Sequence, residues 1–344
     1  MKIILMIAAV FAVLLVIGLV AVFALISIAA LVLLSLFAAG LINFNKPGKG
    51  KQFEKNNPHI SKDGETLVSA HRSGAGIAPE NTLMAFQHCL NSKDFKVDVF
   101  EFDLQLTKDG HLILLHDDTL DRTTNACEHF GEKDVSPSTK TLAELRELNF
   151  GENFEDENGN YPYRGLRGND IPANLRAVTL DEVFDLIEST KKHQYIIELK
   201  DPREQGYKAC DELYRILKQR DMLEQVVFGT FNNEVSKYAT KHHPDLLRSA
   251  CPKEVFYFYM CAVANIRIKP TTFAFSALQI PTDKYTGVRL GTKRIVEYAH
   301  RHNIAVQYWT INQTWEMDYL KSINADCIMT DLPDVAYRIF NERL

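Results

Sequence analysis

The chain has 344 residues, of which 24% are charged, and a formal net charge of −5 at pH 7. A mildly negative charge without a block of basic residues argues against a nucleic-acid partner. The six cysteines are scattered, and no two of them have Cys-x-x-Cys spacing. They are therefore expected to be reduced thiols packed in the interior, as in a cytoplasmic domain.

The first 44 residues are strongly apolar, and residues 3–44 carry no charged side chain. About 20 apolar residues span a bilayer, whereas the apolar core of a secretory signal peptide has about 7 to 15. The run therefore predicts a transmembrane anchor over residues 1–44. Because it is about twice one span, it fits either one long tilted helix or a hairpin that crosses the membrane twice and turns near Gly18.

Lysines flank this run unevenly. One precedes it and four follow it: Lys2, then Lys46, Lys49, Lys51 and Lys55. Positive charge favours the cytoplasmic side, so we expect a membrane protein whose following domain faces the cytoplasm. The polar stretch over residues 45–65 contains prolines and glycines and is expected to be a linker.

Residues 66–344 suit a single α/β domain, in which short apolar runs alternate with amphipathic helical segments. This alternation is typical of parallel βαβ units, and eight apolar runs predict a closed TIM-type (β/α)8 barrel. The expected strands are Thr66–Ala70, Val97–Asp103, Gln194–Lys200, Gln225–Thr230, Leu246–Ala250, Phe273–Ile280, Ile304–Trp309 and Asp326–Thr330. The expected helices are Thr82–Leu90, Leu180–Lys191, Gln205–Gln219, Asn233–Lys241 and Lys293–Arg301.

A further apolar run, which ends at His116, follows the second strand across an Asp-Gly turn. Asp-Gly between two apolar runs is a strong hairpin signal. With the turn centred between Asp109 and Gly110, Asp103 is expected to lie opposite His116, and Glu101 points to the same face.

The segment after this hairpin, residues 117–178, is rich in Gly, Asn and Glu. It is too long for a connection in a compact barrel. We expect an inserted cap near the mouth of the barrel, adjoining His116 and placed to select the alcohol group of a substrate.

Polar side chains stand at the ends of several expected strands, where the pattern alone predicts apolar residues. The C-terminal ends of barrel strands share one face, on which active sites form. Three carboxylates there, Glu101, Asp103 and Glu198, would repel one another without a positive charge between them. A hard divalent cation with oxygen ligands, Mg²⁺ or Ca²⁺, resolves this repulsion.

The remaining side chains of this face suit phosphodiester chemistry. Arg72 and Lys200 bring positive charge for an anionic phosphoryl group. His71 and His116 can remove a proton from the attacking oxygen and give one to the departing oxygen near neutral pH. Trp309 ends the seventh strand, where it either packs in the core or stacks against the substrate.

Asn81 and Thr82 open a helix and are expected to cap it, although Asn81 is also placed to orient a substrate oxygen. Taken singly, each of these polar residues has an ordinary structural explanation. The hypothesis of one site depends on most of them ending different apolar strands.

A series of short motifs occurs in order along the chain and closely resembles the glycerophosphodiester phosphodiesterase family from about Leu67 to near the C-terminus. Each motif is weak alone, whereas the ordered set is specific. The motifs are His71-Arg72, Pro79-Glu80-Asn81-Thr82, Glu101-Phe102-Asp103, Thr107-Lys108-Asp109-Gly110, His116-Asp117-Asp118, Asp121-Arg122-Thr123-Thr124, Glu198-Leu199-Lys200, Trp309-Thr310-Ile311-Asn312 and Thr330-Asp331-Leu332-Pro333.

The resemblance implies a TIM-type barrel that hydrolyses glycerophosphodiesters to an alcohol and glycerol 3-phosphate, an activity of lipid and glycerol metabolism. It makes His71 and His116 the acid–base pair, and it makes the three carboxylates the metal ligands. Arg72, Lys200, Trp309 and Asn81 are then expected to bind substrate. One departure concerns Ser73, since the family usually has glycine after His-Arg.

Two alternatives remain open at this point. One is a phospholipase D-like phosphodiesterase that acts on lysophospholipid or phosphatidylglycerol, which the anchor would hold near its substrate. The other is a catalytically silent membrane receptor for phosphodiester headgroups, which loss of a histidine or a metal carboxylate would have indicated. In each case the expected partners are a phosphodiester substrate and the lipid bilayer.

Overall fold

The structure, a computed structural model, describes the ranges 2–44, 57–62, 64–188, 193–266, 273–283 and 287–341. In the predicted linker over residues 45–65, residues 45–56 and residue 63 lie outside these ranges, as do residues 189–191 at the end of one predicted helix. The chain divides into two compact units, Met1–Lys46 and Pro47–Leu344.

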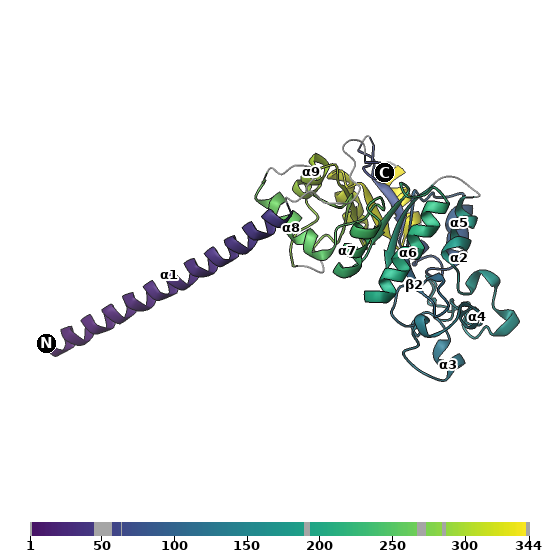
Figure 1. Ribbon diagram of the computed structural model, residues 1–344, viewed down its shortest axis with the longest axis horizontal. Coiled ribbons are helices and arrows are strands. Elements are labelled where there is room, and N and C mark those ends of the chain that lie inside the picture. Colours follow the sequence, from purple (N-terminus) through teal and green to yellow (C-terminus); the bar gives the residue numbers. More distant parts are fainter. Residues whose placement is uncertain are drawn as a thin grey trace. The chain divides into compact units, whose positions relative to one another are not determined.

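The first unit is one helix, α1 (Lys2–Phe44), drawn in purple in Figure 1. Its 23-residue stretch Val13–Ser35 is long and apolar enough to cross a membrane, and its side chains are exposed. A helix satisfies every backbone group within the segment, as a hydrocarbon environment requires. A signal sequence at an N-terminus has the same character. Because α1 continues through Gly18, the structure has the single helix of the two alternatives and not the hairpin.

Seven parallel strands form the sheet among the described residues of the second unit, in the order β5-β4-β2-β1-β8-β7-β6. They are β1 (Leu67–Ala70), β2 (Val99–Leu106), β4 (Gln194–Leu199), β5 (Val226–Gly229), β6 (Ala277–Ile280), β7 (Ala305–Tyr308) and β8 (Cys327–Thr330). The predicted TIM-type barrel is confirmed.

The predicted strand Leu246–Ala250 is not a strand in the structure. Two isolated bridges take its place in the ring, from Arg248 to Phe228 of β5 and from Ser249 to Ala277 of β6. Pro244 and Pro252 bound this segment. Because proline has no backbone N–H to give to a ladder, the pairing that nearly closes the barrel is confined to a few residues.

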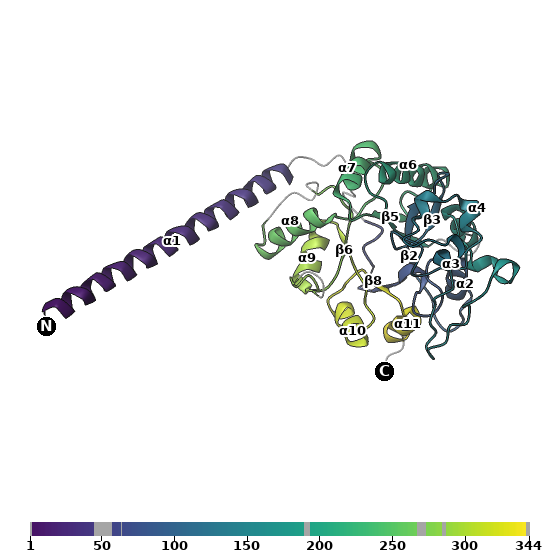
Figure 2. The same ribbon diagram turned by 90° about the horizontal axis from the view of Figure 1, so that it is seen from below.

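Helices surround the sheet, and α8 and α9 lie on the side opposite α2, α3 and α4 (Figure 2). The barrel helices are α2 (Leu83–Asn91), α5 (Leu180–Glu188), α6 (Arg203–Gln219), α7 (Asn233–His242), α8 (Pro252–Val263), α9 (Lys293–Arg301), α10 (Thr314–Ser322) and α11 (Pro333–Asn341). Several begin at a capping side chain: Thr82, Asn232 and Thr292 each accept a hydrogen bond from a backbone N–H of the first turn. Thr82 thereby fixes the start of α2 beside the predicted site.

The hairpin after β2 forms, but its predicted register is wrong by one residue. Strand β3 (Leu112–Leu114) pairs antiparallel with β2, and Leu104 is opposite Leu114. The turn has three residues and not two, because the Thr107 N–H donates to the His111 carbonyl oxygen at 2.9 Å. Gly110 takes φ 87° in this turn, as is common in three-residue hairpin loops.

This register places Leu115, and not His116, opposite Asp103. The Leu115 N–H donates to the Asp103 carbonyl oxygen at 3.1 Å, and the Gln105 side-chain amide donates to the carbonyl oxygens of Leu115 and Asp117. His116 therefore follows the end of the ladder, where the chain is free to turn toward the barrel mouth.

The segment 117–178, predicted as a cap, contains two short helices, α3 (Ala126–Phe130) and α4 (Leu142–Leu145), and several 3₁₀ turns. It has an apolar cluster of its own, which includes Leu120, Leu145 and Phe150 and packs against Ile113 and Leu115 of the hairpin arm. Figure 1 shows α3 and α4 together beyond one end of α6. Its role in choosing the alcohol stays a prediction.

Candidate active site

A cavity of about 490 Å³ opens where the strands end. Every predicted site residue except Asn81 lines it: His71, Arg72, Glu101, Asp103, His116, Glu198, Lys200 and Trp309. Asn81 stands directly behind this lining, since its side-chain amide donates to Asp103 Oδ2 at 3.2 Å. The structure thus brings the predicted residues together from four strands, the hairpin arm and the start of α2.

His71 follows β1 and is oriented by the chain segment after β8. Its Nδ1 lies 2.6 Å from Asp331 Oδ1, and the Asn312 side-chain amide donates to Asp331 Oδ2 at 2.6 Å. With Nδ1 engaged, Nε2 is left toward Glu101, whose Oε2 is 4.0 Å away. Burial disfavours the imidazolium, but the carboxylates of Glu101 and Asp331 outweigh burial and raise the pKa of His71.

His116, which lines the same cavity, has an equivalent arrangement. Its Nδ1 lies 2.6 Å from Asp117 Oδ1, and the Arg122 guanidinium binds both carboxylate oxygens of Asp117. Burial lowers the pKa of His116, with Lys200 and Arg72 acting in the same direction. Despite burial, the hydrogen bonds from Arg122 and His116 hold the pKa of Asp117 at about 2, so that Asp117 is a carboxylate at neutral pH.

Glu80 joins the two histidine-bearing segments. It accepts two hydrogen bonds from Arg122, at 2.9 and 2.7 Å, and one from Arg72 Nη1 at 3.2 Å. Arg72 directly follows His71, and Arg122 holds Asp117 beside His116. Glu80 therefore ties both segments through charge-assisted hydrogen bonds, which are about twice as strong as neutral ones.

The three carboxylates come from adjacent strands. Glu101 and Asp103 are two residues apart on β2, so they share a face, and Asp103 is the direct ladder partner of Glu198 on β4. Glu101 and Asp103 are buried, 4% and 1% exposed. Burial and the charge of Asp103 raise the pKa of both Glu101 and Glu198.

Two cations offset this negative charge. Lys200 Nζ lies 2.9 Å from Glu198 Oε1 and 3.6 Å from Asp103 Oδ1, and Arg72 Nε lies 3.8 Å from Asp103 Oδ2. Burial opposes the charge of Lys200, but the neighbouring carboxylates dominate and raise its pKa. The Arg72 backbone N–H also donates to Glu101 Oε2 at 2.7 Å.

The donor set suits a divalent cation with oxygen ligands. Burial and mutual repulsion raise the pKa of Glu101 and Glu198, and a cation bound between them would relieve that repulsion. Asn81 Oδ1 is buried and, among the described residues, accepts no hydrogen bond. It is thus one more oxygen beside Asp103. Within the described ranges, however, no three acidic, His or Cys side chains already form a compact ligand cluster, and Lys200 stands between two of the carboxylates.

One side of the cavity is apolar. Trp309 follows β7 and meets Phe231 edge-on, with ring centroids 5.9 Å apart. Beyond them the lining continues through Val255, Ile280 and Leu290. The cavity therefore has a charged end, which holds the histidines and carboxylates, and an apolar end, which is formed after β5, β6 and β7.

Ser73, where the family usually has glycine, lies in the left-handed region with φ 68°. Its side chain is fully buried, and its hydroxyl makes no hydrogen bond to any described residue. Both features cost free energy, because a left-handed non-glycine residue is strained and a buried hydroxyl without a partner loses its hydration. His71 and Arg72, which directly precede Ser73, still line the cavity.

Sequence reasoning did not assign roles to the residues that orient the histidines: Asp117, Arg122, Glu80, Asp331 and Asn312. All five lie in motifs that the sequence analysis quoted. Asp117 was accessible to prediction because it adjoins His116. Asp331 lies 260 positions from His71. The predicted closed barrel sets β8 beside β1, but the strand pattern does not say which side chains after the two strands meet.

Comparisons with known proteins find similarity over most of the chain. Residues 71–335 match the model of the glycerophosphoryl diester phosphodiesterase family. A glycerophosphodiester phosphodiesterase of Caldanaerobacter subterraneus is 29% identical over 272 residues, covering 78% of this chain and 96% of the relative. One of Bacillus subtilis is 27% identical over 281 residues, covering 79% of this chain and 86% of the relative.

Solved structures agree in fold. A crystal structure of a putative glycerophosphoryl diester phosphodiesterase from Silicibacter pomeroyi has a TM-score of 0.64 at 20% identity, covering 82% of this chain and 95% of that one. A phosphodiesterase of Oleispira antarctica in complex with the product sn-glycerol-3-phosphate has a TM-score of 0.59 at 21% identity, covering 81% and 98%.

Replacing Ser73 by glycine should stabilise the protein. The change removes the strained conformation and the unpartnered hydroxyl, so we expect the free energy of unfolding to rise by about 1 kcal/mol. Ser73→Ala, which removes the hydroxyl but keeps the strain, is the matched control and should gain less. Chemical denaturation measures both, and a Ser73→Gly protein less stable than the wild type would contradict this account.

The Glu80–Arg122 pair should behave as one unit in catalysis. Glu80→Gln and Arg122→Gln should each lower kcat by about tenfold, and the double variant should lose little more than either single one, because neighbours in one network are not additive. Arg146→Gln, which breaks the 2.7 Å ion pair with Glu182 outside the cavity, is the control and should leave kcat unchanged. Losses that multiply in the double variant would show that the two residues act separately.

Proposed function

Because the chain belongs to the glycerophosphoryl diester phosphodiesterase family and is a phosphoric diester hydrolase, we propose that His71 and His116 catalyse metal-assisted hydrolysis of glycerophosphodiesters to an alcohol and glycerol 3-phosphate. The observation that supports this most directly is that the two histidines are bound in the same way. Each is held at Nδ1 by a carboxylate, and both line one cavity with three carboxylates and two cations.

Proton transfer follows from this arrangement. With Nδ1 of each ring bound to Asp331 or Asp117, Nε2 is the atom available to the substrate. One Nε2 takes the proton from the attacking oxygen, and the other, protonated, gives its proton to the departing alcohol oxygen. The paired aspartates stabilise whichever ring carries the positive charge, as a buried aspartate does beside a catalytic histidine.

The phosphoryl group is expected to lie near Arg72 and Lys200, whose charges offset those of the phosphate oxygens. Glu101, Asp103 and Glu198, with Asn81 Oδ1 beside them, would hold Mg²⁺ or Ca²⁺. When bound, the cation polarises a phosphoryl oxygen and offsets the negative charge that develops on it. Trp309 forms the wall against which the rest of the substrate rests.

Two names among the comparisons support the proposed substrate. The Caldanaerobacter relative is called a glycerophosphodiester phosphodiesterase, and the Oleispira structure holds sn-glycerol-3-phosphate as product. We further propose that α1 keeps the enzyme at a membrane and that the barrel faces the cytoplasm, as the lysine distribution indicates. The silent receptor is set aside, since the chain belongs to a family of enzymes and all of the predicted catalytic residues are present.

A lipid-directed phosphodiesterase acting on lysophospholipid or phosphatidylglycerol is the second candidate. The apolar end of the cavity favours it, because a small polar glycerophosphodiester does not need Phe231, Val255 and Leu290 around it, whereas an acyl chain does. Comparing kcat/KM of the full chain for glycerophosphocholine, glycerophosphoglycerol and lysophosphatidylcholine decides between the two. A preference for the lysolipid would select the second candidate.

Loss of either histidine should remove the acid–base chemistry. We expect His71→Ala and His116→Ala to lower kcat by about a hundredfold or more. His111→Ala is the control, because His111 lies on the same hairpin with its side chain 52% exposed and should leave kcat unchanged. Near-normal turnover in either catalytic variant, with a wild-type thermal melting curve, would contradict the acid–base assignment.

Metal removal should abolish activity, and Mg²⁺ or Ca²⁺ should restore it, because the buried carboxylates need positive charge. Glu101→Gln, Asp103→Asn and Glu198→Gln should each raise the half-saturating metal concentration by about tenfold or more. Titration calorimetry without substrate should show that the same variants bind the metal more weakly. Glu147→Gln, at a carboxylate whose side chain is 66% exposed, is the control. Full activity in excess chelator would exclude the metal.

A further inference from the structure

Exposed apolar side chains are segregated on the barrel unit. Outside α1, the large hydrophobic residues that are exposed among the described ones are Phe231, Phe256, Val263, Val288, Trp315 and Tyr319, with Tyr161 of the cap as the single other case. The first six fall in one stretch of the chain, between β5 and the end of α10. Exposed apolar residues scattered singly need no explanation, whereas a cluster on one side indicates an interaction surface.

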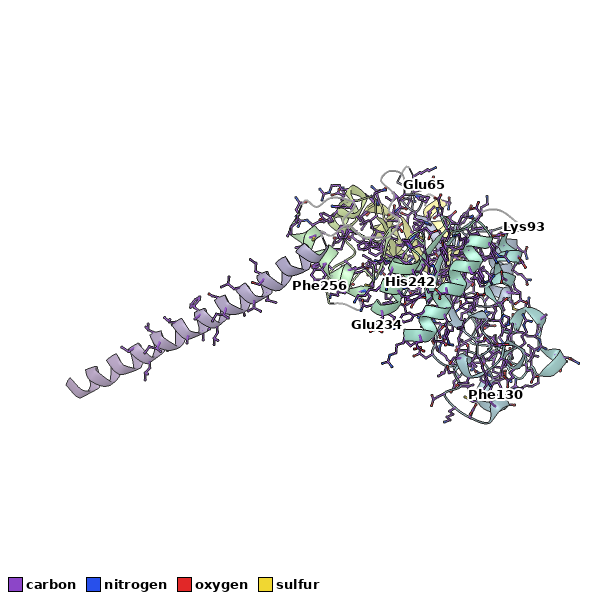
Figure 3. All side chains as sticks on the ribbon, viewed as in Figure 1. Glu65, Lys93, Phe130, Glu234, His242 and Phe256 are labelled. Atoms are coloured by element: carbon purple, nitrogen blue, oxygen red, sulfur yellow. The ribbon has the colours of Figure 1, made fainter. Side chains whose placement is uncertain are left out.

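Four of them define what we call the apolar rim: Phe231, Phe256, Val288 and Trp315, exposed by 57%, 59%, 36% and 67%. Phe231 follows β5, Val288 lies in the loop after β6, and Trp315 stands in the first turn of α10 after β7. They therefore belong to the mouth side of the barrel. Figure 3 labels Phe256 and Phe130 of the cap well apart from each other on the barrel unit.

The apolar rim is continuous with the active-site cavity. Phe231 lines the cavity and also belongs to the rim, and Val255, next to Phe256 in α8, is part of the same lining. The Tyr319 hydroxyl donates to the Gly291 carbonyl oxygen at 3.0 Å and joins α10 to the loop that carries Val288. Phe231, which also contacts Trp309 inside the cavity, thus joins the rim to the cavity.

Basic side chains accompany the rim. Lys253 precedes Phe256 by one helical turn and Arg289 follows Val288, and both are exposed. Neither forms an ion pair with another described residue. Aromatic and aliphatic side chains next to exposed lysine and arginine suit the boundary between anionic lipid headgroups and acyl chains.

We propose that the apolar rim rests on the surface of an anionic bilayer, so that the cavity mouth opens toward lipid. The occupant is a bilayer and not a protein because α1, on the same chain, is long and apolar enough to lie in one, which keeps lipid at high effective concentration beside the barrel. The inference rests on the proposed function and deepens it, since an acyl chain can then pass from the bilayer into the apolar end of the cavity.

Tryptophan fluorescence tests the docking itself. The chain has two tryptophans, Trp309 in the cavity and Trp315 in the rim. The fluorescence of the wild type minus that of Trp315→Phe is therefore the fluorescence of Trp315. In full-length protein reconstituted into phosphatidylcholine–phosphatidylglycerol vesicles, doxyl lipid with a shallow label should quench Trp315 strongly and aqueous iodide should quench it weakly. Quenching by iodide without quenching by doxyl lipid would overturn the proposal.

Kinetics test its consequence. In the reconstituted full chain, Phe256→Ser with Trp315→Ser should lower kcat/KM for bilayer-borne lysophosphatidylglycerol about tenfold and leave that for soluble glycerophosphocholine within about twofold. Tyr161→Ser, at the exposed aromatic residue of the cap, is the control and should change neither. Equal losses on both substrates, or none on the lysolipid, would overturn the docking role.

The two proposals fail in different ways. If the unmodified chain hydrolyses no glycerophosphodiester, the proposed function fails, while the fluorescence result still decides whether the rim meets lipid. If hydrolysis is normal and Trp315 lies in water, the rim proposal fails and the proposed function stands.

Discussion

The site depends on negative charge buried at the ends of the adjacent strands β2 and β4. Glu101 and Asp103 share a face of β2, and the ladder sets Glu198 beside Asp103, so the repulsion among them follows from backbone geometry and cannot be relieved by rotating one side chain. Positive charge must come from elsewhere. Arg72, Lys200 and His71 bring it from β1 and β4, and a bound cation would complete the compensation.

The positive charges that offset these carboxylates are themselves held by further ion pairs. Arg72 lies close to Asp103 and forms an ion pair with Glu80. Glu80 also pairs with Arg122, and Arg122 pairs with Asp117, the residue that binds His116. Each cation is thus fixed by a second carboxylate, and the position of His116 depends on the turn that carries His71. The backbone beside these charged groups is in an unusual conformation, since Arg72, Ser73 and Asn81 all have positive φ. Only asparagine adopts that conformation readily, which is consistent with strain concentrated at a functional site.

The sequence predicted the site better than it predicted the connections. Carboxylates and histidines at the ends of apolar strands were readable because a strand interior otherwise excludes charge, and seven strands of the barrel lie where the alternation placed them. The hairpin register was wrong by one residue, because an Asp-Gly pair does not say whether two or three residues form the turn. The segment Leu246–Ala250 has the composition of a strand, but flanking prolines limit its pairing. The contact between His71 and Asp331 depends on how the chain turns directly after β1 and β8, which the pattern of strands does not contain.

The two sides of the barrel mouth differ in the forces that organise them. The side beside the cap positions His116 through ion pairs and hydrogen bonds, which are sensitive to geometry and therefore suit proton transfer. The side after β5, β6 and β7 offers apolar contact, which tolerates different shapes and suits a mobile acyl chain. A substrate that spans the cavity would present its phosphodiester to the first side and its hydrocarbon to the second. Changes to the groups that orient His116 should therefore act mainly on kcat for every substrate, whereas changes on the apolar side should act mainly on the preference between soluble and lipid substrates.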